Sequence, residues 1–204
     1  MSKNGDHDDD LRGMKVLLAD QDEGALRIAA ALVRDLGHEV IELAVGVQEA
    51  AEVIARDDPD LSIVVDDDDY ALDLIEEITE YARGPVIAMV EKEDPEFVSE
   101  AAKRGIYAYA REGLADSIQS AIEVAVRRHA ETRELAEQVE RLETALERRA
   151  LIERAKGILM ERHNIGEREA FNRLREHARS RNRTVVAVSA SVAEGHALLP
   201  KARD

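Results

Sequence analysis

Two acidic stretches in the first half of the chain carry side chains that could bind a cation. Asp20 and Asp22 come directly after the apolar run "VLLA", and four consecutive aspartates begin at Asp66, after "LSIVV". Carboxylate oxygens are the ligands that Mg²⁺ and Ca²⁺ prefer. The four carboxylates from Asp66 to Asp69 could therefore bind a divalent cation, with Mg²⁺ the one candidate in a chain for which no cofactor is otherwise expected. The alternative is that these aspartates are loop residues in contact with solvent.

Basic residues gather in the segment "RAKGILMERHN" and in the residues that follow it. Residues 148–183 hold 11 Lys and Arg against 5 Asp and Glu, a net charge of +6. Residues 1–147 hold 15 against 37, a net charge of −22, and the whole chain has a net charge of −16. An acidic protein is repelled by nucleic acid phosphates, whereas a basic segment attracts them. The asymmetry therefore predicts different functions for the two parts.

The elements that position the aspartates alternate regularly along residues 14–128. Short apolar runs predict strands at 14–20, 38–44, 60–66, 85–91 and 106–111. Each run is followed by a segment of helical periodicity, and Gly37, an Asp-Asp-Pro sequence and Gly84 end three of these helices. Five strand–helix units with apolar strands predict a flavodoxin-like, doubly wound α/β domain with a five-stranded parallel sheet.

A long helix is predicted to follow the last strand. Apolar or small residues recur at steps of three and four from Ile118 to Leu146, and no Gly or Pro interrupts them. This heptad-like stripe predicts a coiled-coil dimer over residues 129–149. The alternative is a single amphipathic helix that packs on its own α/β domain.

The segments "VLLAD", "PDLSIVVD", "PVIAMV" and "AAKRGIYAYA" resemble the receiver domain of two-component response regulators. The resemblance implies a phosphoryl-transfer site made of an acidic pair, an acceptor Asp, a hydroxyl and a Lys, which together compensate charge around phosphorus. The acidic pair, which helps to hold Mg²⁺ in a receiver, is changed here to Asp20 and Gln21, with Asp22 one position late. The resemblance therefore makes Asp20, Asp22 and Asp66 the candidate metal ligands. The acceptor position falls on Val65, and Asp66 reaches it only with a shift of one residue.

The two remaining phosphate-binding positions of a receiver are also replaced. The hydroxyl position falls on Val90, which cannot hydrogen-bond a phosphate, and the Lys position falls on Glu112, which would repel one. These replacements predict a pseudo-receiver, a domain that keeps the fold but has lost or weakened phosphotransfer. Asp66 is the candidate phosphoacceptor if any transfer persists.

Three further helices are predicted after residue 149. Their sequence "ALIERAKGILMERHNIGEREAFNRLREHARSRNRTVVAV" resembles the ANTAR family of RNA-binding antitermination domains, on the strength of "AKGILM", "EAF..LR..A" and "NR". The resemblance implies a three-helix RNA-binding bundle at residues 150–195 that binds paired stem-loops in nascent transcripts. The third helix, "TVVAVSASV", departs from the family pattern.

Helical spacing places Lys156, Met160 and His163 on one face, away from the apolar stripe. Phe171 is expected on the core face of the next helix, so that RNA readout would not use aromatic stacking. The candidate RNA-binding residues are Lys156, Gly157, Met160, His163, Arg168, Arg175, Arg179, Asn182 and Arg183.

These features predict a dimeric, cytoplasmic antitermination regulator that is not an enzyme. The chain has no Cys, and no apolar run approaches the roughly 20 residues that span a bilayer. A disordered segment is expected at residues 1–13 and a flexible tail at 196–204. RNA stem-loops, a second copy of the chain, and a sensor kinase or other regulatory protein are the expected partners. The alternatives are a DNA-binding response regulator and a coiled-coil interaction scaffold.

Overall fold

The computed structural model describes residues 13–44, 47–92 and 94–197. The chain divides into two compact units, Met1–Arg133 and Glu134–Asp204. The expected disordered start and flexible tail lie almost wholly outside the described residues. The last helix runs to Ala197, so the tail that was expected from residue 196 begins inside this helix.

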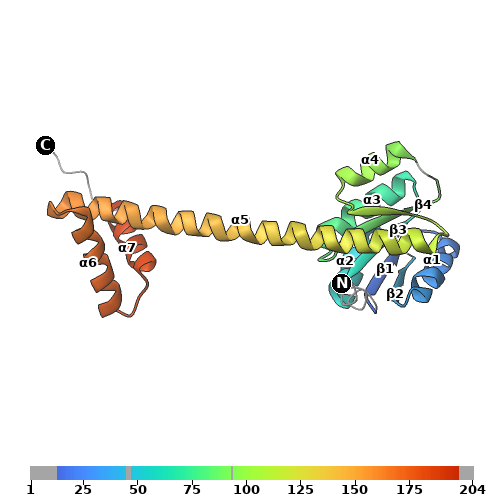
Figure 1. Ribbon diagram of the computed structural model, residues 1–204, viewed down its shortest axis with the longest axis horizontal. Helices are drawn as coiled ribbons and strands as arrows, with labels where there is room; N and C mark the ends of the chain where they lie inside the picture. Colours follow the sequence, from blue (N-terminus) through green and yellow to red (C-terminus); the bar gives the residue numbers. More distant parts are fainter. Residues whose placement is uncertain (1–12, 45–46, 93, 198–204) are drawn as a thin grey trace, which may run out of the picture. The chain divides into compact units, whose positions relative to one another are not determined.

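The first unit contains the predicted five-stranded parallel sheet (Figure 1). The strand order is β2-β1-β3-β4-β5, which is the flavodoxin-like order. β3 and β4 are buried along their whole length, whereas each of the edge strands β2 and β5 has one buried residue and is otherwise exposed or half-buried. The strands are β1 (Lys15–Ala19), β2 (Glu39–Leu43), β3 (Leu61–Val65), β4 (Val86–Val90) and β5 (Ala108–Arg111).

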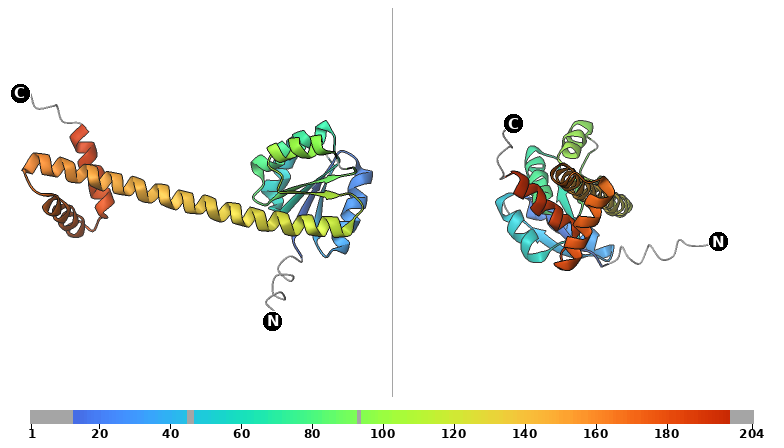
Figure 2. Two further views of the ribbon diagram at one scale, coloured as in Figure 1. Left: turned by 45° about the horizontal axis from the view of Figure 1, so that its top comes forward. Right: turned by 90° about the vertical axis from the view of Figure 1, so that its left-hand side faces the viewer.

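Helices cover both faces of this sheet with an aliphatic core (Figure 1 and Figure 2). One face packs against α1 (Glu23–Asp35) and the first turns of α5 (Ala115–His163). The other face packs against α2 (Val47–Asp57), α3 (Asp69–Tyr81) and α4 (Pro95–Lys103). The fold class predicted from the apolar strands is therefore confirmed.

Aspartates in the loops after the strands begin three of these helices. Asp22 accepts a hydrogen bond from the backbone N–H of Gly24 at 2.6 Å and so caps α1. Asp68 caps α3 and Asp94 caps α4 in the same manner. A capping side chain satisfies a helix N–H that has no partner within the helix. Part of the acidic character of these loops therefore has a structural function.

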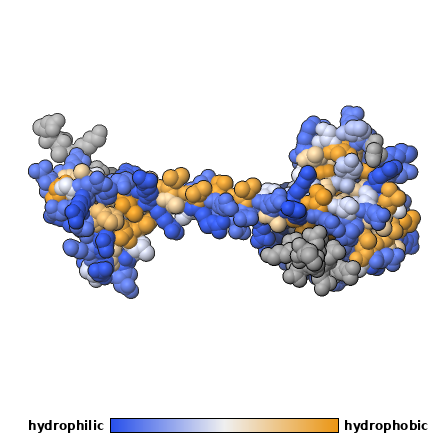
Figure 3. Space-filling model, viewed as in Figure 1, coloured by the Kyte–Doolittle hydropathy of each residue, from blue (hydrophilic) through white to orange (hydrophobic). Residues whose placement is uncertain are grey.

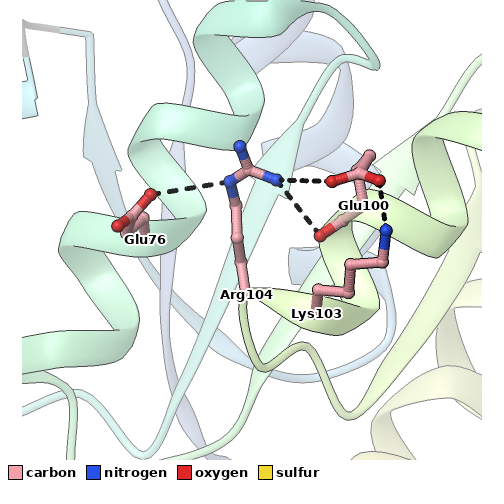
Figure 4. Close-up of polar contacts among 4 residues, drawn as sticks. All are labelled: Glu76, Glu100, Lys103 and Arg104. Carbon is pink, nitrogen blue, oxygen red and sulfur yellow. Dashed lines mark hydrogen bonds and ion pairs between the residues drawn. The ribbon is translucent and has the colours of Figure 1, made fainter.

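Ion pairs hold α4 against α3 (Figure 4). The guanidinium of Arg104 lies between the two helices, with Nε 3.6 Å from Glu76 on α3 and Nη1 3.4 Å from Glu100 on α4. Lys103 adds a contact of 2.5 Å to the second oxygen of Glu100. The Lys103 hydrogen bond lowers the pKa of Glu100, and Arg104 acts in the same direction. Arg104 thus joins the end of α4 to its neighbour.

The C-terminal unit differs from the prediction in its first helix. The first of the three helices predicted after residue 149 is not separate but is the last part of α5, which continues from Ala115 to His163. No Gly, Pro or N-cap residue stands between Leu146 and Leu151, so nothing ends the helix there. α6 (Glu167–Ser180) and α7 (Val185–Ala197) follow. The small core of the unit is formed by Ala155, Leu174, Ala178 and Val188.

Candidate functional site

The carboxylate of Asp20 is buried at the end of β1. The residue is 3% exposed, and one of its oxygens accepts a hydrogen bond from the backbone N–H of Asp22 at 3.1 Å. The other oxygen has no hydrogen-bond partner among the described residues. Burial raises the pKa of Asp20, and the negative charge of Asp66 adds to this effect.

Asp66 directly follows β3 and has an unusual backbone conformation. Its φ angle is 87°, in the left-handed region that residues other than glycine rarely adopt. Its carboxylate accepts a hydrogen bond from the N–H of Asp67 at 2.7 Å, and Asp67 in turn accepts one from the N–H of Lys92 at 3.4 Å. The acidic cluster is therefore organised by local hydrogen bonds to the backbone.

The three proposed metal ligands do not come together as a ligand set. Asp20 and Asp66 lie close enough for their charges to interact, but Asp22 is committed to the first turn of α1. Within residues 13–44, 47–92 and 94–197 there is no group of three or more His, Asp or Glu side chains placed to hold a metal ion. Within the described residues Asp20, Asp22 and Asp66 are thus not placed together as a set of three ligands, and one oxygen of Asp22 caps a helix.

The positions that would bind a phosphate lie at the same edge of the sheet. Val90 ends β4 and is fully buried, and its carbonyl accepts a hydrogen bond from the N–H of Glu112 at 2.9 Å. By the resemblance stated from the sequence, an isopropyl group and a carboxylate stand at the positions expected to carry a hydroxyl and an ammonium group. Neither can compensate the charge of a phosphoryl group.

Basic residues of α6 and of the loop after it form a second candidate site. Arg168, Arg175 and Arg179 are all exposed on α6. Asn182 and Arg183 follow in the loop, where Asn182 has a left-handed φ of 49°. Thr184 accepts a hydrogen bond from the N–H of Ala187 at 3.1 Å and so caps the start of α7.

The end of α5 contributes the remaining candidate residues to this second site. His163 is exposed and Met160 is half-buried. Gly157 is exposed, and a Cβ built on it would have no atom within 4 Å outside its own helix and chain neighbours. Packing against this chain therefore does not require a glycine at this position. The open helix surface leaves room for the close approach of another molecule.

Lys156 is placed differently from the sequence-based expectation. It is 7% exposed, and its ammonium group lies 2.8 Å from Glu153 on α5 and 2.5 Å from Glu167 at the start of α6. These hydrogen bonds raise the pKa of Lys156 and lower that of Glu167. The expectation of an exposed face was wrong because α6 folds back and covers Lys156 with Glu167.

Phe171 was expected in the core and is instead 37% exposed. The buried positions of α6 are Ala170, Leu174 and Ala178, at steps of four residues, and Phe171 lies beside this row. Phe171 and Lys156 line a hollow of about 390 Å³. Aromatic stacking in RNA readout had been excluded because Phe171 was expected in the core, and its exposure removes that reason.

The apolar stripe of α5 divides into two parts. Ile118, Ile122 and Ala125 are buried against the sheet of the first unit, which matches the alternative reading for this part of the helix. The second part stays exposed over the middle of α5, where Figure 3 shows apolar atoms on its surface. The exposed residues are Leu135 (62%), Val139 (54%), Leu142 (64%) and Leu146 (65%).

Comparisons with known proteins agree on the family of this chain. Residues 140–192 match the ANTAR domain. The transcriptional regulatory protein PdtaR of Mycobacterium tuberculosis, in strains CDC 1551 / Oshkosh and ATCC 25618 / H37Rv, is 33% identical over 184 residues, which cover 88% of this chain and 89% of PdtaR. This chain belongs to the ANTAR-domain response regulators.

Solved structures support the fold of the first unit of this ANTAR response regulator. The signal receiver domain of a modulated diguanylate cyclase from Desulfovibrio desulfuricans G20 is 19% identical, with a TM-score of 0.50 over 58% of this chain and 97% of that chain. The receiver domain of an HD domain-containing protein from Pseudomonas fluorescens Pf-5 is 20% identical, with a TM-score of 0.50 over 59% and 99%. At this identity the likeness shows the receiver fold alone.

The ANTAR match begins at residue 140, inside α5, ten residues before the bundle predicted from the sequence. No helix within the described part of this regulator is long and apolar enough to cross a membrane.

Proposed function

We propose that this ANTAR response regulator acts in the cytoplasm as a homodimer that binds paired RNA stem-loops and promotes transcription antitermination. The observation that carries the proposal is the net charge of +6 on residues 148–183, within a chain of net charge −16. A local excess of cations attracts the phosphates of RNA even when the rest of the protein is acidic. The family membership makes a nascent transcript the natural ligand.

The side chains that would contact RNA are the exposed bases of α6 and of the loop after it. Arg168, Arg175 and Arg179 share one face of α6, whereas Arg183, in the loop after Asn182, donates hydrogen bonds to Ala187 and Ser191 of α7. Gly157, Met160 and His163 border the open helix surface of α5. Lys156 takes a positioning role in this proposal, because its ammonium group is already bound by two carboxylates.

The exposed apolar stripe of α5 supports the proposed dimer. Four large apolar residues from Leu135 to Leu146 follow steps of four, three and four residues, which is the spacing of a coiled-coil seam. A dimer presents two copies of the basic unit. Binding of both stem-loops would then raise the affinity through effective concentration, without any additional contact.

The receiver-like unit would act as a docking or sensing platform with degenerate phosphotransfer. A buried Val90 and a carboxylate at Glu112 leave a phosphoryl group on Asp66 without its usual charge compensation. A sensor kinase or another regulatory protein is the partner that we propose for this unit. Incubation of the protein with a small phosphodonor and Mg²⁺, followed by intact mass analysis, should show no stoichiometric label. Stoichiometric labelling of Asp66 would contradict this part of the proposal.

A binding titration tests the RNA-binding function. The full-length protein is titrated with an RNA of two stem-loops, an RNA of one stem-loop and a duplex DNA at several salt concentrations. We expect the two-loop RNA to bind most tightly, and we expect Arg175→Ala to weaken binding to both RNAs. Each lost phosphate contact should flatten the dependence of log affinity on log salt by about 0.7–0.9.

Arg27→Ala provides the matched control, because Arg27 is an exposed arginine on α1 in the receiver-like unit. It should leave RNA affinity unchanged. Preference for duplex DNA over both RNAs would instead support a DNA-binding regulator. Absence of binding to any nucleic acid at low salt would contradict the proposal and favour an interaction scaffold.

A further inference from the structure

A pocket of about 290 Å³ lies in the C-terminal unit between the end of α5, α6 and α7. Its apolar lining consists of Leu159 from α5, Leu174 from α6, and Val188 and Val192 from α7. Leu174 and Val188 are 1% and 4% exposed, so the floor of the pocket is the surface of the small core itself. The side chains that form the floor of the pocket are therefore held in place by their packing in this core.

Polar side chains line the same pocket beside this apolar floor. They are Arg173 and His177 from α6, Arg183 from the loop, and Ser191 from α7. Arg183 is held in place because its Nη2 atom donates hydrogen bonds to the carbonyl of Ala187 and to Oγ of Ser191, each at 3.1 Å. A guanidinium group has five N–H donors, and these two bonds involve only one of its nitrogens. A neutral imidazole adds one donor and one acceptor.

The charge of this pocket differs from that of the neighbouring hollow beside Phe171. That hollow is lined by Glu153 and Glu167 as well as by Lys156, which both glutamates bind. No carboxylate is among the residues that line the pocket at Leu159 and Arg183, although Arg173, one of these residues, forms an ion pair of 2.7 Å with Glu169. A ligand with flanking phosphates is therefore repelled less at the second pocket than at the first.

We propose that this pocket binds a single unpaired nucleobase from the loop of an RNA stem-loop. The face of a nucleobase is flat and apolar, so it can pack on the apolar side chains of Leu159 and Val192. The edge of the base carries hydrogen-bond donors and acceptors that can bond to Arg183 and His177. Bases in RNA loops are unstacked, so that their faces and edges are open to protein side chains. Arg183 is then the cation that would meet a phosphate beside the bound base, because Arg173 is already ion-paired with Glu169 at 2.7 Å. This inference rests on the proposed RNA-binding function and assigns a base-binding subsite to it.

Abasic substitution in the RNA, combined with variants of the pocket, tests the inference. The full-length protein and its Ser191→Phe variant are titrated with the two-stem-loop RNA and with a set of RNAs in which each loop nucleotide in turn is abasic. Ser191 is exposed on α7, so that a phenyl group at this position covers the pocket without entering the core. Ser180→Phe is the control, because Ser180 is also exposed and does not line the pocket.

We expect one abasic position to weaken binding to the unmodified protein by about tenfold or more. Ser191→Phe should weaken binding to the intact RNA by a similar factor, and the abasic position should cause no further loss in this variant. His177→Ala, a truncation of an exposed side chain, should show the same lack of additivity even if Ser191→Phe folds poorly. Ser180→Phe should bind as the unmodified protein does.

The outcomes separate this inference from the function on which it rests. If the RNA binds but both pocket variants keep full affinity, or if every abasic loss adds to theirs, the base pocket is refuted and RNA binding stands. Phe171→Leu is titrated in the same series to test the neighbouring hollow. If an abasic position couples to Phe171→Leu instead, the base binds at that hollow and the inference is also wrong. If the unmodified protein binds no RNA, both the function and the subsite are refuted.

Discussion

Leu174 is the side chain on which the folding of the C-terminal unit should depend most. It is 1% exposed and lies in a core of four buried residues, of which two are alanines. Leu174→Ala removes three carbon atoms, which costs about 2.4 kcal/mol of transfer free energy at about 0.8 kcal/mol for each carbon. The cavity that remains adds to this cost, and Leu→Ala changes in cores cost about 2–5 kcal/mol in all.

This loss is large for a unit that consists of Glu134–Asp204. Typical stabilities of about 0.05–0.15 kcal/mol per residue give such a unit about 4–10 kcal/mol in total. We therefore expect Leu174→Ala to unfold α6 and α7 in a large fraction of molecules at moderate urea concentrations. The receiver-like sheet should stay folded, because Leu174 belongs to the core of the other unit.

Hydrogen exchange monitored by mass spectrometry distinguishes the two units. Amides of α6 and α7 should lose protection in Leu174→Ala, while amides of β1, β3 and β4 should keep it. Leu174→Met is the control, since a swap that conserves volume usually costs less than about 1.5 kcal/mol. The reasoning is refuted if Leu174→Ala changes the unfolding free energy of the unit by less than about 1 kcal/mol, or if the sheet loses protection equally.

Three further predictions concern charge and assembly. Because Lys156 lowers the pKa of Glu167, the contribution of this pair to stability is complete above pH 4.5 and is lost as the pH falls through the lowered pKa. Thermal melts between pH 7 and 3 should show this loss of stability. The Glu167→Gln variant should not show the pH-dependent loss. Burial raises the pKa of Asp20 above 3.8, so Asp20→Asn should increase the melting temperature at pH 7 and have no such effect below pH 3.8; an unchanged melt at pH 7 would contradict this. Leu142→Lys should convert the proposed dimer to a monomer in sedimentation experiments, whereas Glu140→Lys, on the face of α5 away from the apolar stripe, should not.

Much of the first unit could be predicted because its signals are local. Apolar runs such as "LSIVV" contain β-branched residues and are bounded by polar loops, and a strand buried on both faces needs little else to be recognised. Gly37 follows α1 with a φ of 91°, as expected of a helix stop. The edge strand β2 was predicted to be wholly apolar. Its exposed residues result from its position at the edge of the sheet, and that position is set by the order of the strands.

The candidate sites were less predictable because they depend on residues distant in sequence. Lys156 was placed on an open face, since spacing along one helix does not reveal that Glu167 of the next helix will cover it. Phe171 was placed in the core because helical spacing allows a wide apolar face, and only the position of the neighbouring helices decides which part of that face is buried. Asp22 was proposed as a metal ligand, although its sequence position before Glu23 and Gly24 is also that of a helix cap.

The sequence by itself determined the class of each part of this protein. Hydrophobic periodicity and turn residues act over a few residues, so they specified the parallel α/β unit, the apolar stripe of α5 and the basic segment at 148–183. The tertiary structure alone decided which side of each helix meets a neighbour: it buried Lys156 beneath two glutamates, exposed Phe171, and formed the pocket between Leu159, Leu174 and Arg183. The physical reason is that burial and ion pairing depend on which helices pack together, and that packing is settled by all the contacts of the unit at once.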